Sequence, residues 1–176
     1  MNGVLFALLR PHFGRRAAGV LSGYEGGEFR FSPVAEQDIE RLSRFLTSQP
    51  AERMRYFNPH GFDTATLRRL HRNPAFVMMK AENGDGTLAG YFFLRCFFTG
   101  KAFHGLAASE QVRGCGLGRQ MWYLSSKICA AGGVRMLATV SEQNVPSLVS
   151  ARQGTHVTVV ERLFGNYLLI ECKPEE

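Results

Sequence analysis

The sequence predicts an α/β (α+β) fold in which a mostly antiparallel, mixed sheet of about seven strands is flanked by about four helices. Three observations predict it. Short apolar runs bounded by glycine, asparagine and proline recur along the chain. Residues 117–131 repeat apolar side chains at helical spacing. The length of 176 residues, with 45% apolar and 20% charged residues, suits one folded domain.

We divide the chain into an N-terminal extension, residues 1–27, and a domain, residues 28–176. Arginines without an acid before Glu25 leave a transit peptide or a membrane-touching basic helix open as alternatives for the extension. We favour a segment that packs on the domain or frays. The domain begins with a strand at Glu28–Phe31, and Ser32-Pro33 then predicts the N-cap and first residue of a helix.

The first half of the domain continues with that helix and a meander. An apolar stripe marks the helix, which ends at Gln49-Pro50, and residues 51–61 are expected to form a structured loop. Asp63 caps a second helix that runs to Arg72. Three strands follow, with Asn83-Gly84-Asp85-Gly86 turning the first into the second. The stripe is Ile39, Leu42, Phe45 and Leu46, and the strands are residues 75–80, 88–98 and 102–108.

The second half contains the strongest helix, residues 117–131, which Gly132-Gly133 closes. The apolar run 134–140 is typical of a strand covered on both faces. Asn144-Val145-Pro146 opens a last helix that ends near Gly154. Residues 156–161 and 167–172 complete the sheet.

The net charge of +6 and the pI of about 9.5 indicate an anionic partner. No run of five basic residues and no zinc-finger or RNP-type motif accompanies the charge, so a polyanionic cofactor is more economical than nucleic acid. No apolar run approaches the roughly 20 residues that cross a bilayer, and we expect no membrane partner.

The cysteines suggest a cytoplasmic protein with reduced thiols. Cys96, Cys115, Cys129 and Cys172 form no C-x-x-C pair and no spacing of a zinc site, so no metal is expected.

A glycine-rich loop carries the clearest functional signal. Arg113-Gly114-Cys115-Gly116-Leu117-Gly118 joins a strand to a helix, where free backbone amides and the helix dipole favour a phosphate. The spacing excludes a Walker A loop, and a dinucleotide fingerprint would need glycine at Arg119. A turn without any ligand remains the alternative for the loop taken alone.

The surrounding motifs resemble the GNAT acetyltransferase superfamily over about residues 28–172. Arg113, Gly116 and Gly118 fill its Arg/Gln-x-x-Gly-x-Gly/Ala signature. Leu106-Ala107-Ala108 is similar to its fourth strand, and Asn144 with Ser147 to the start of its fourth helix. The resemblance implies a sheet whose fourth and fifth strands splay apart, and acetyl-CoA as cosubstrate.

Carried over by position, the resemblance implies that backbone amides from Arg113 to Arg119 hold the CoA pyrophosphate and that Leu106 to Ala108 pair with the pantetheine arm. Asn144 would touch that arm. The implied CoA-binding residues are Leu106, Ala107, Ala108, Arg113, Gly114, Cys115, Gly116, Leu117, Gly118, Arg119, Asn144 and Ser147.

His104 is the candidate catalytic base, because a neutral imidazole suits proton removal and arylalkylamine N-acetyltransferases carry a histidine at the similar position. A structural histidine is the alternative. The family's tyrosine late in the fourth helix is replaced by Ser150-Ala151-Arg152, which leaves the general acid unassigned. Thr139 replaces the glutamate of RimI-like enzymes, which argues against a protein substrate.

The predicted function is transfer of an acetyl group to a primary amine of a small molecule, with an amino sugar or a polyamine as examples, by direct attack in a ternary complex. Tyr56, Phe57 and His60 are the candidate substrate-binding residues, with the core as their alternative location. The alternatives are an inactive acyl-CoA-binding module and a protein N-terminal or lysine acetyltransferase. A homodimer is the oligomer considered.

Overall fold

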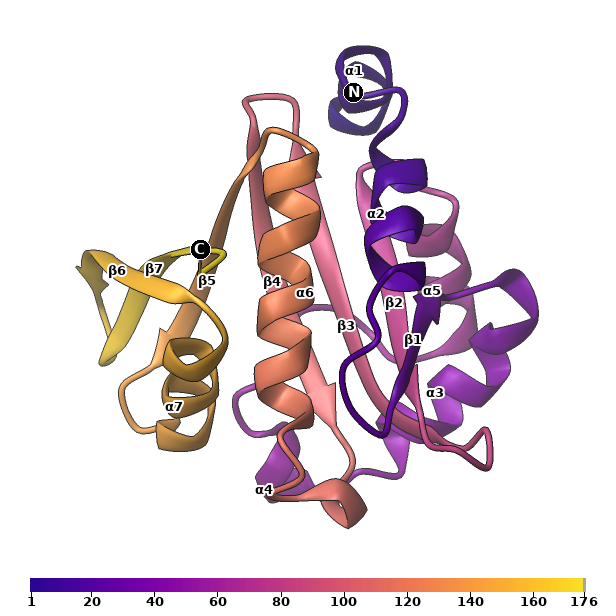
Figure 1. The fold of residues 1–176 in the computed structure, drawn as a ribbon, viewed down its shortest axis with the longest axis vertical. Coiled ribbons are helices and arrows are strands. Elements are labelled where there is room, and N and C mark those ends of the chain that lie inside the picture. The colour runs from indigo at the N-terminus through magenta and orange to yellow at the C-terminus, as the bar shows by residue number, and fades with distance from the viewer. Residues whose placement is uncertain (176) are drawn as a thin grey trace.

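A single seven-stranded sheet in the order β1-β2-β3-β4-β5-β7-β6 organises the computed structural model, which describes residues 1–175 (Figure 1). All neighbouring strands are antiparallel except β4 and β5, which are parallel. The strands are β1 (Arg30–Pro33), β2 (Phe76–Glu82), β3 (Leu88–Phe97), β4 (Lys101–Ala108), β5 (Arg135–Ser141), β6 (His156–Leu163) and β7 (Tyr167–Lys173). The predicted mixed sheet is therefore confirmed.

Seven α-helices lie in the described residues, where about four were expected from the sequence. Two come from the N-terminal 27 residues, and a short one lies where a loop was predicted. The helices are α1 (Asn2–Leu9), α2 (Phe13–Ser22), α3 (Ile39–Thr47), α4 (Ala51–Met54), α5 (Thr64–His71), α6 (Leu117–Ala131) and α7 (Val145–Gly154). None of them is both long and apolar enough to cross a bilayer.

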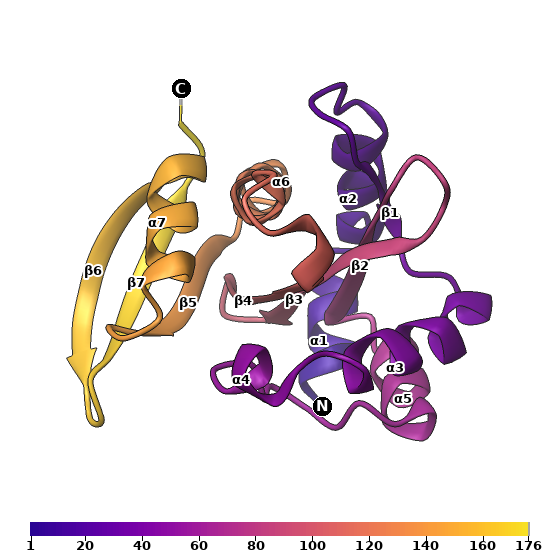
Figure 2. The ribbon, with the colours of Figure 1, turned by 90° about the horizontal axis from the view of Figure 1, so that it is seen from below.

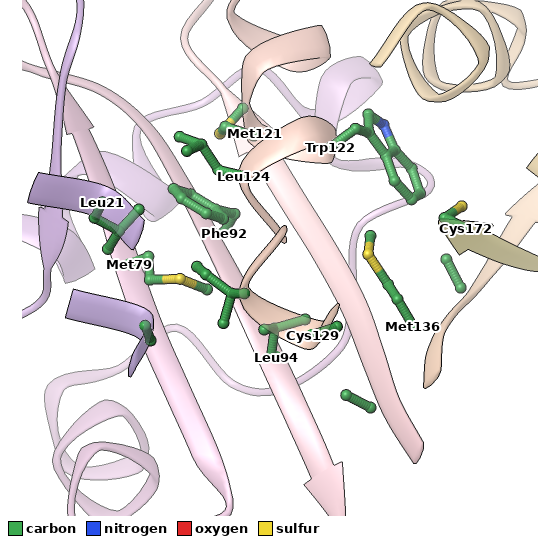
Figure 3. Packing of buried hydrophobic residues seen from close by; sticks show 14 of the residues in the cluster. Leu21, Met79, Phe92, Leu94, Met121, Trp122, Leu124, Cys129, Met136 and Cys172 are labelled. Carbon is green, nitrogen blue, oxygen red and sulfur yellow. The ribbon is translucent and has the colours of Figure 1, made fainter. Parts of the chain in front are cut away.

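The helices cover the sheet from two sides (Figure 2). α2 and α6 lie over one face, and α3 and α5 lie over the other. A large apolar cluster fills the space under α2 and α6, and Figure 3 shows Leu21, Met79, Phe92 and Met121 within it. Phe6, Phe13, Ala17 and Leu21 of the first two helices are all buried, so residues 1–27 pack on the domain.

The start of the domain differs from the prediction. Ser32 and Pro33 belong to β1 and do not begin a helix. Proline is tolerated there because β1 is an edge strand, where a missing N–H breaks no ladder on the open side. The first α-helix after β1 starts only at Ile39, after a 3-10 turn in which the Asp38 carboxylate accepts a hydrogen bond from the Ala35 amide at 2.9 Å.

β4 and β5 diverge soon after they meet. Only Lys101–Phe103 pairs with Arg135–Leu137. β4 continues to Ala108 alongside β3, while β5 stays paired with β7 as far as Ser141. The splay expected from the resemblance is thus present, and β4 has an unpaired edge from His104 onward.

α6 and α7 stand side by side beyond this divergence and touch through glycines. A Cβ atom at Gly154 would lie 2.4 Å from the backbone carbonyl oxygen of Arg119, and one at Gly118 would lie 3.3 Å from Ser150. The approach of α7 to α6 therefore depends on the absence of a side chain at Gly154.

We predict that Gly154→Ala lowers the free energy of unfolding by about 1–3 kcal/mol, because the added methyl group meets backbone that has to shift. Gly19→Ala is the matched control. Gly19 lies within α2 with nothing within 4 Å of a Cβ atom, so the change should stabilise the protein by about 0.5–1 kcal/mol. Urea unfolding of both variants measures the difference, and equal effects would contradict the proposed tight contact.

Candidate functional site

A cavity of about 540 Å³ opens where β4 and β5 diverge. Its walls come from β4, the loop before α6, the first turns of α6, the end of β5 and α7. Residues near α4 close one side. The lining includes residues 104–109, 112–114, 116–119 and 138–141, together with Arg53, Met54, Tyr56, Phe57, Trp122, Asn144, Pro146, Ser147, Val149, Ser150 and Gln153.

The β4 wall exposes backbone hydrogen-bonding groups. The Ser109 amide donates to Ala89 of β3 at 2.8 Å, and the Arg135 amide donates to Gly100 at 2.9 Å. Because backbone groups of successive residues alternate across a strand, the even-numbered residues direct theirs toward β5. Leu106 and Ala108 lie past the paired segment, so their N–H and C=O groups face the cavity edge without a strand partner. An extended ligand with amide groups fits such an edge.

The loop before α6 forms a second wall. Gly114 and Gly116 have φ of 82° and 76°, a left-handed conformation that favours glycine. Gln120 is the first residue of α6 whose amide bonds to a carbonyl one turn earlier, that of Gly116, at 3.1 Å. The amides of residues 117–119 therefore project from the helix start, where the helix dipole also favours negative charge. This end of the cavity is suited to a phosphate.

All the predicted cofactor-binding residues except Cys115 line this one cavity. The Cys115 side chain is exposed, with its Sγ atom 4.0 Å from the carbonyl oxygen of Arg113. Asn144 lies at the opposite wall and also caps α7, because its Oδ1 accepts a hydrogen bond from the Ser147 amide at 3.4 Å. The structure thus brings together motifs that are separated by up to 40 residues in the chain.

His104 also lines the cavity, but it is almost completely buried. Its ring lies 4.3 Å from the Trp122 ring, and neither of its nitrogens has a hydrogen-bond partner among the described residues. Burial lowers the pKa of His104 to about 3, an effect that the nearby Phe93 backbone only partly offsets. The imidazole is therefore neutral at pH 7.

Trp122 is the main lining residue that the sequence analysis missed. Its Nε1 atom is buried without a partner, and its indole belongs to the same apolar cluster as Met136 and Cys172 (Figure 3). Trp122 does not belong to the apolar stripe that predicted α6. The sequence therefore assigned it no role. Its position one turn after Gly118 was the available signal, because residues i and i+4 share a helix face.

The candidate substrate-binding residues separate into two groups. Tyr56 and Phe57 line the cavity, and the Tyr56 hydroxyl donates to Gln143 at 3.4 Å. His60 does not line it. Its ring lies among core aromatics, its Nε2 atom is 3.3 Å from the Tyr91 hydroxyl, and burial lowers its pKa. Those aromatics are Phe62, Phe76, Tyr91 and Phe93.

The charged residues of the lining are all cations. Arg53, Arg113 and Arg119 border the cavity, whereas no aspartate or glutamate among the described residues does. Glu110 lies outside the lining and pairs with Arg53 at 2.6 Å. Among residues 1–175, no group of three potential metal ligands is arranged to hold an ion.

Several solved structures of acetyltransferases match this fold, among them a GNAT domain. The GNAT domain of S. lividans PAT matches with a TM-score of 0.71 at 17% identity, covering 84% of this chain and 91% of its own. Spermidine N-acetyltransferase from Vibrio cholerae, in complex with CoA and spermine, matches with 0.64 at 12% identity, covering 82% and 93%. Mycobacterium smegmatis RimJ, in complex with CoA-disulfide, matches with 0.59 at 18% identity, covering 82% and 81%.

No family model and no curated protein matches the chain by sequence. At these identities the structural likeness establishes the fold. The chain therefore has the GNAT fold, as its motifs predicted.

The burial of His104 predicts an acid-sensitive fold. Between about pH 6.5 and pH 3 the unfolded chain binds a proton at this position and the folded chain does not, so stability falls as the pH falls. From pH 7 to pH 5 this costs about 2 kcal/mol. In urea unfolding, the free energy of unfolding of His104→Gln should not show this fall between pH 7 and pH 5. The fall should remain in His156→Gln, which changes a histidine at an exposed position of β6. The same pH dependence in wild type and His104→Gln would contradict the burial argument.

Proposed function

We propose that this chain, which has the GNAT fold, transfers the acetyl group of acetyl-CoA to a primary amine of a small molecule. One observation carries the proposal. A single cavity combines a phosphate-type loop at the start of α6, an unpaired strand edge on β4 and a neutral, unpartnered imidazole. A phosphorylated thioester with amide groups requires the loop and the strand edge. A nucleophilic amine requires the imidazole.

The residues present fit CoA. The amides of residues 117–119 would hold the pyrophosphate, with Arg113 and Arg119 close enough to add positive charge. The backbone of Leu106 and Ala108 would bond the pantetheine amides in the manner of an added strand. Asn144 and Ser147 would face that arm from α7. Acetyl-CoA supplies the acetyl thioester.

The proposed acetyl transfer requires few chemical groups from the protein. The amine nitrogen attacks the thioester carbonyl carbon, a nitrogen proton is lost, and the C–S bond breaks to release the thiolate. His104 is the proposed acceptor of that proton, because it lines the cavity and neither of its nitrogens has a hydrogen-bond partner among the described residues. Its pKa of about 3 makes it a weak base, which holds the proton only in passing. A thiol has a pKa of about 8.5, so the leaving thiolate takes up the proton that the imidazolium releases, directly or through water, and one proton moves from nitrogen to sulfur overall. The absence of the family's tyrosine from α7 is compatible with that.

The residues that line the cavity restrict the class of acceptor amine that suits it. With Arg113 and Arg119 assigned to the cosubstrate, the charged residue left for the acceptor in the described lining is Arg53, which pairs with Glu110 at 2.6 Å. A polyamine carries several positive charges and would find no carboxylate in that lining. Tyr56 and Phe57 add an aromatic wall near α4. We therefore propose a small molecule with one reactive amine that is otherwise neutral or anionic, and disfavour the polyamine that the sequence left open. An amino sugar remains within this class.

We predict that the wild-type protein releases CoA thiol from acetyl-CoA in the presence of such an amine and that His104→Ala lowers kcat about 10²–10⁴-fold. Acetyl-CoA binding should be unchanged in the variant. A panel of amino sugars, amino acids, arylalkylamines and spermidine, assayed for thiol release, measures this. Tight acetyl-CoA binding without turnover of any amine would support the inactive binding module instead. Unaltered turnover in His104→Ala would remove the base assignment.

We predict that a carboxylate at the loop repels the cosubstrate. Gly116→Asp should raise the Kd for acetyl-CoA at least tenfold relative to Gly116→Asn, because the two side chains have the same shape and differ in charge. Both residue types tolerate the left-handed conformation, and nothing lies within 4 Å of a Cβ atom at this position. Isothermal titration of both variants provides the comparison. Equal Kd values would place the pyrophosphate elsewhere.

A further inference from the structure

An exposed apolar patch lies at the end of the molecule opposite the phosphate-type loop. Val4, Leu8 and Leu9 of α1 are 65%, 73% and 60% exposed, and Phe98 in the β3–β4 turn is 47% exposed. We call these four residues the α1 patch. Figure 1 shows α1 at this end of the fold, near the β3–β4 turn. Exposed apolar side chains that gather at one end of a fold mark interaction surfaces more often than isolated ones do.

α1 is fixed in place, so the exposure is a property of the fold. Phe6, on its inner side, is 1% exposed and packs edge-on against Phe13 with ring centroids 5.3 Å apart. The Asn2 side chain donates to the Cys96 carbonyl at 2.9 Å and accepts from the Phe98 amide at 3.2 Å. Those two bonds tie α1 to the β3–β4 turn. Val4 and Leu8 lie one turn apart and share the outer face.

Arginines flank the α1 patch. Arg10 and Arg16 border a small cavity together with Leu9 and His12, and Arg15 donates a hydrogen bond to His12. No aspartate or glutamate occurs before Glu25. An apolar surface beside a basic one is complementary to a bilayer interface, where acyl chains lie beneath anionic headgroups.

We propose that the α1 patch inserts into the interface of an anionic phospholipid bilayer while Arg10, Arg15 and Arg16 contact the headgroups. A second copy of the chain fits this surface less well, because a twofold contact would bring like-charged arginines face to face. The sequence left a membrane-touching basic helix open for residues 1–27, but it favoured a segment that packs on the domain, and no membrane partner was expected. The outward position of Val4 and Leu8 comes from the packing of α1.

This docking leaves the cavity accessible. The α1 patch lies near the C-terminal end of α6, because Leu9 and Gly132, the residue after α6, line the same small cavity. The proposed CoA site lies at the N-terminal end of α6. A helix of 15 residues is about 22 Å long, so the two surfaces lie at opposite ends of α6, about that far apart. The proposal is therefore independent of the proposed enzymatic function.

Cosedimentation with vesicles tests the proposal. We expect binding to phosphatidylcholine vesicles that contain phosphatidylglycerol, little binding to phosphatidylcholine alone, and weaker binding as salt is raised. Val4→Ser/Leu8→Ser and Arg15→Gln/Arg16→Gln should each weaken binding about tenfold or more. Acetyl-CoA binding, measured on the same variants, should be unchanged and verifies that they fold.

Two matched controls set the baseline. Val159→Ser/Val160→Ser removes two half-exposed valines of β6, and Arg30→Gln/Arg44→Gln removes two exposed arginines from β1 and α3. Both should bind vesicles within about twofold of wild type. The proposal is overturned if the controls weaken binding as much, or if wild type ignores anionic vesicles at low salt. A dimer that Val4→Ser/Leu8→Ser converts to a monomer would show that a second copy covers the patch.

Discussion

The divergence of β4 from β5 is the constraint on which the candidate site depends. Three residue pairs hold the two strands together, and after Phe103 each strand follows its other neighbour. An unpaired strand edge inside a sheet is costly, since its amides and carbonyls lack partners. Here the unpaired edge of β4 forms one wall of the cavity and provides its hydrogen-bonding groups. The same groups that a closed sheet would satisfy are left for a ligand.

The gap persists because both sides of it are braced. β5 remains bonded to β7 along its length, and α7 is held against α6 by the close approach at Gly154. The Trp122 indole, from α6, occupies the same apolar cluster as Met136 of β5. Closing the sheet would require these contacts to break together. The cavity is thus built into the packing of two helices and two strands, and side-chain movement alone would not remove it.

The sequence predicted the parts of this site that depend on local chemistry. Glycines in the loop before α6, the cap at Asn144 and the strand that contains Leu106 each have a signature within a few residues. It did not predict Trp122, and it left His60 open between the substrate site and the core, because both positions depend on which side chains the fold brings together. The helical start at Ser32-Pro33 failed for a related reason. Pairing with β2 overrode a local capping signal.

α6 runs between the two ends of the molecule, and its two termini carry opposite partial charges. Its free amides at residues 117–119 face the cavity, and its last carbonyls face the N-terminal segment, where Arg16 donates to Ala131. A helix dipole favours an anion at the first end and a cation at the second. The arginines of the segment that follows α1 are therefore near the end of α6 where positive charge is stabilised. One helix thus has a phosphate-type site at its first end and a basic surface at its last end, where the proposed cosubstrate and the proposed bilayer headgroups would bind.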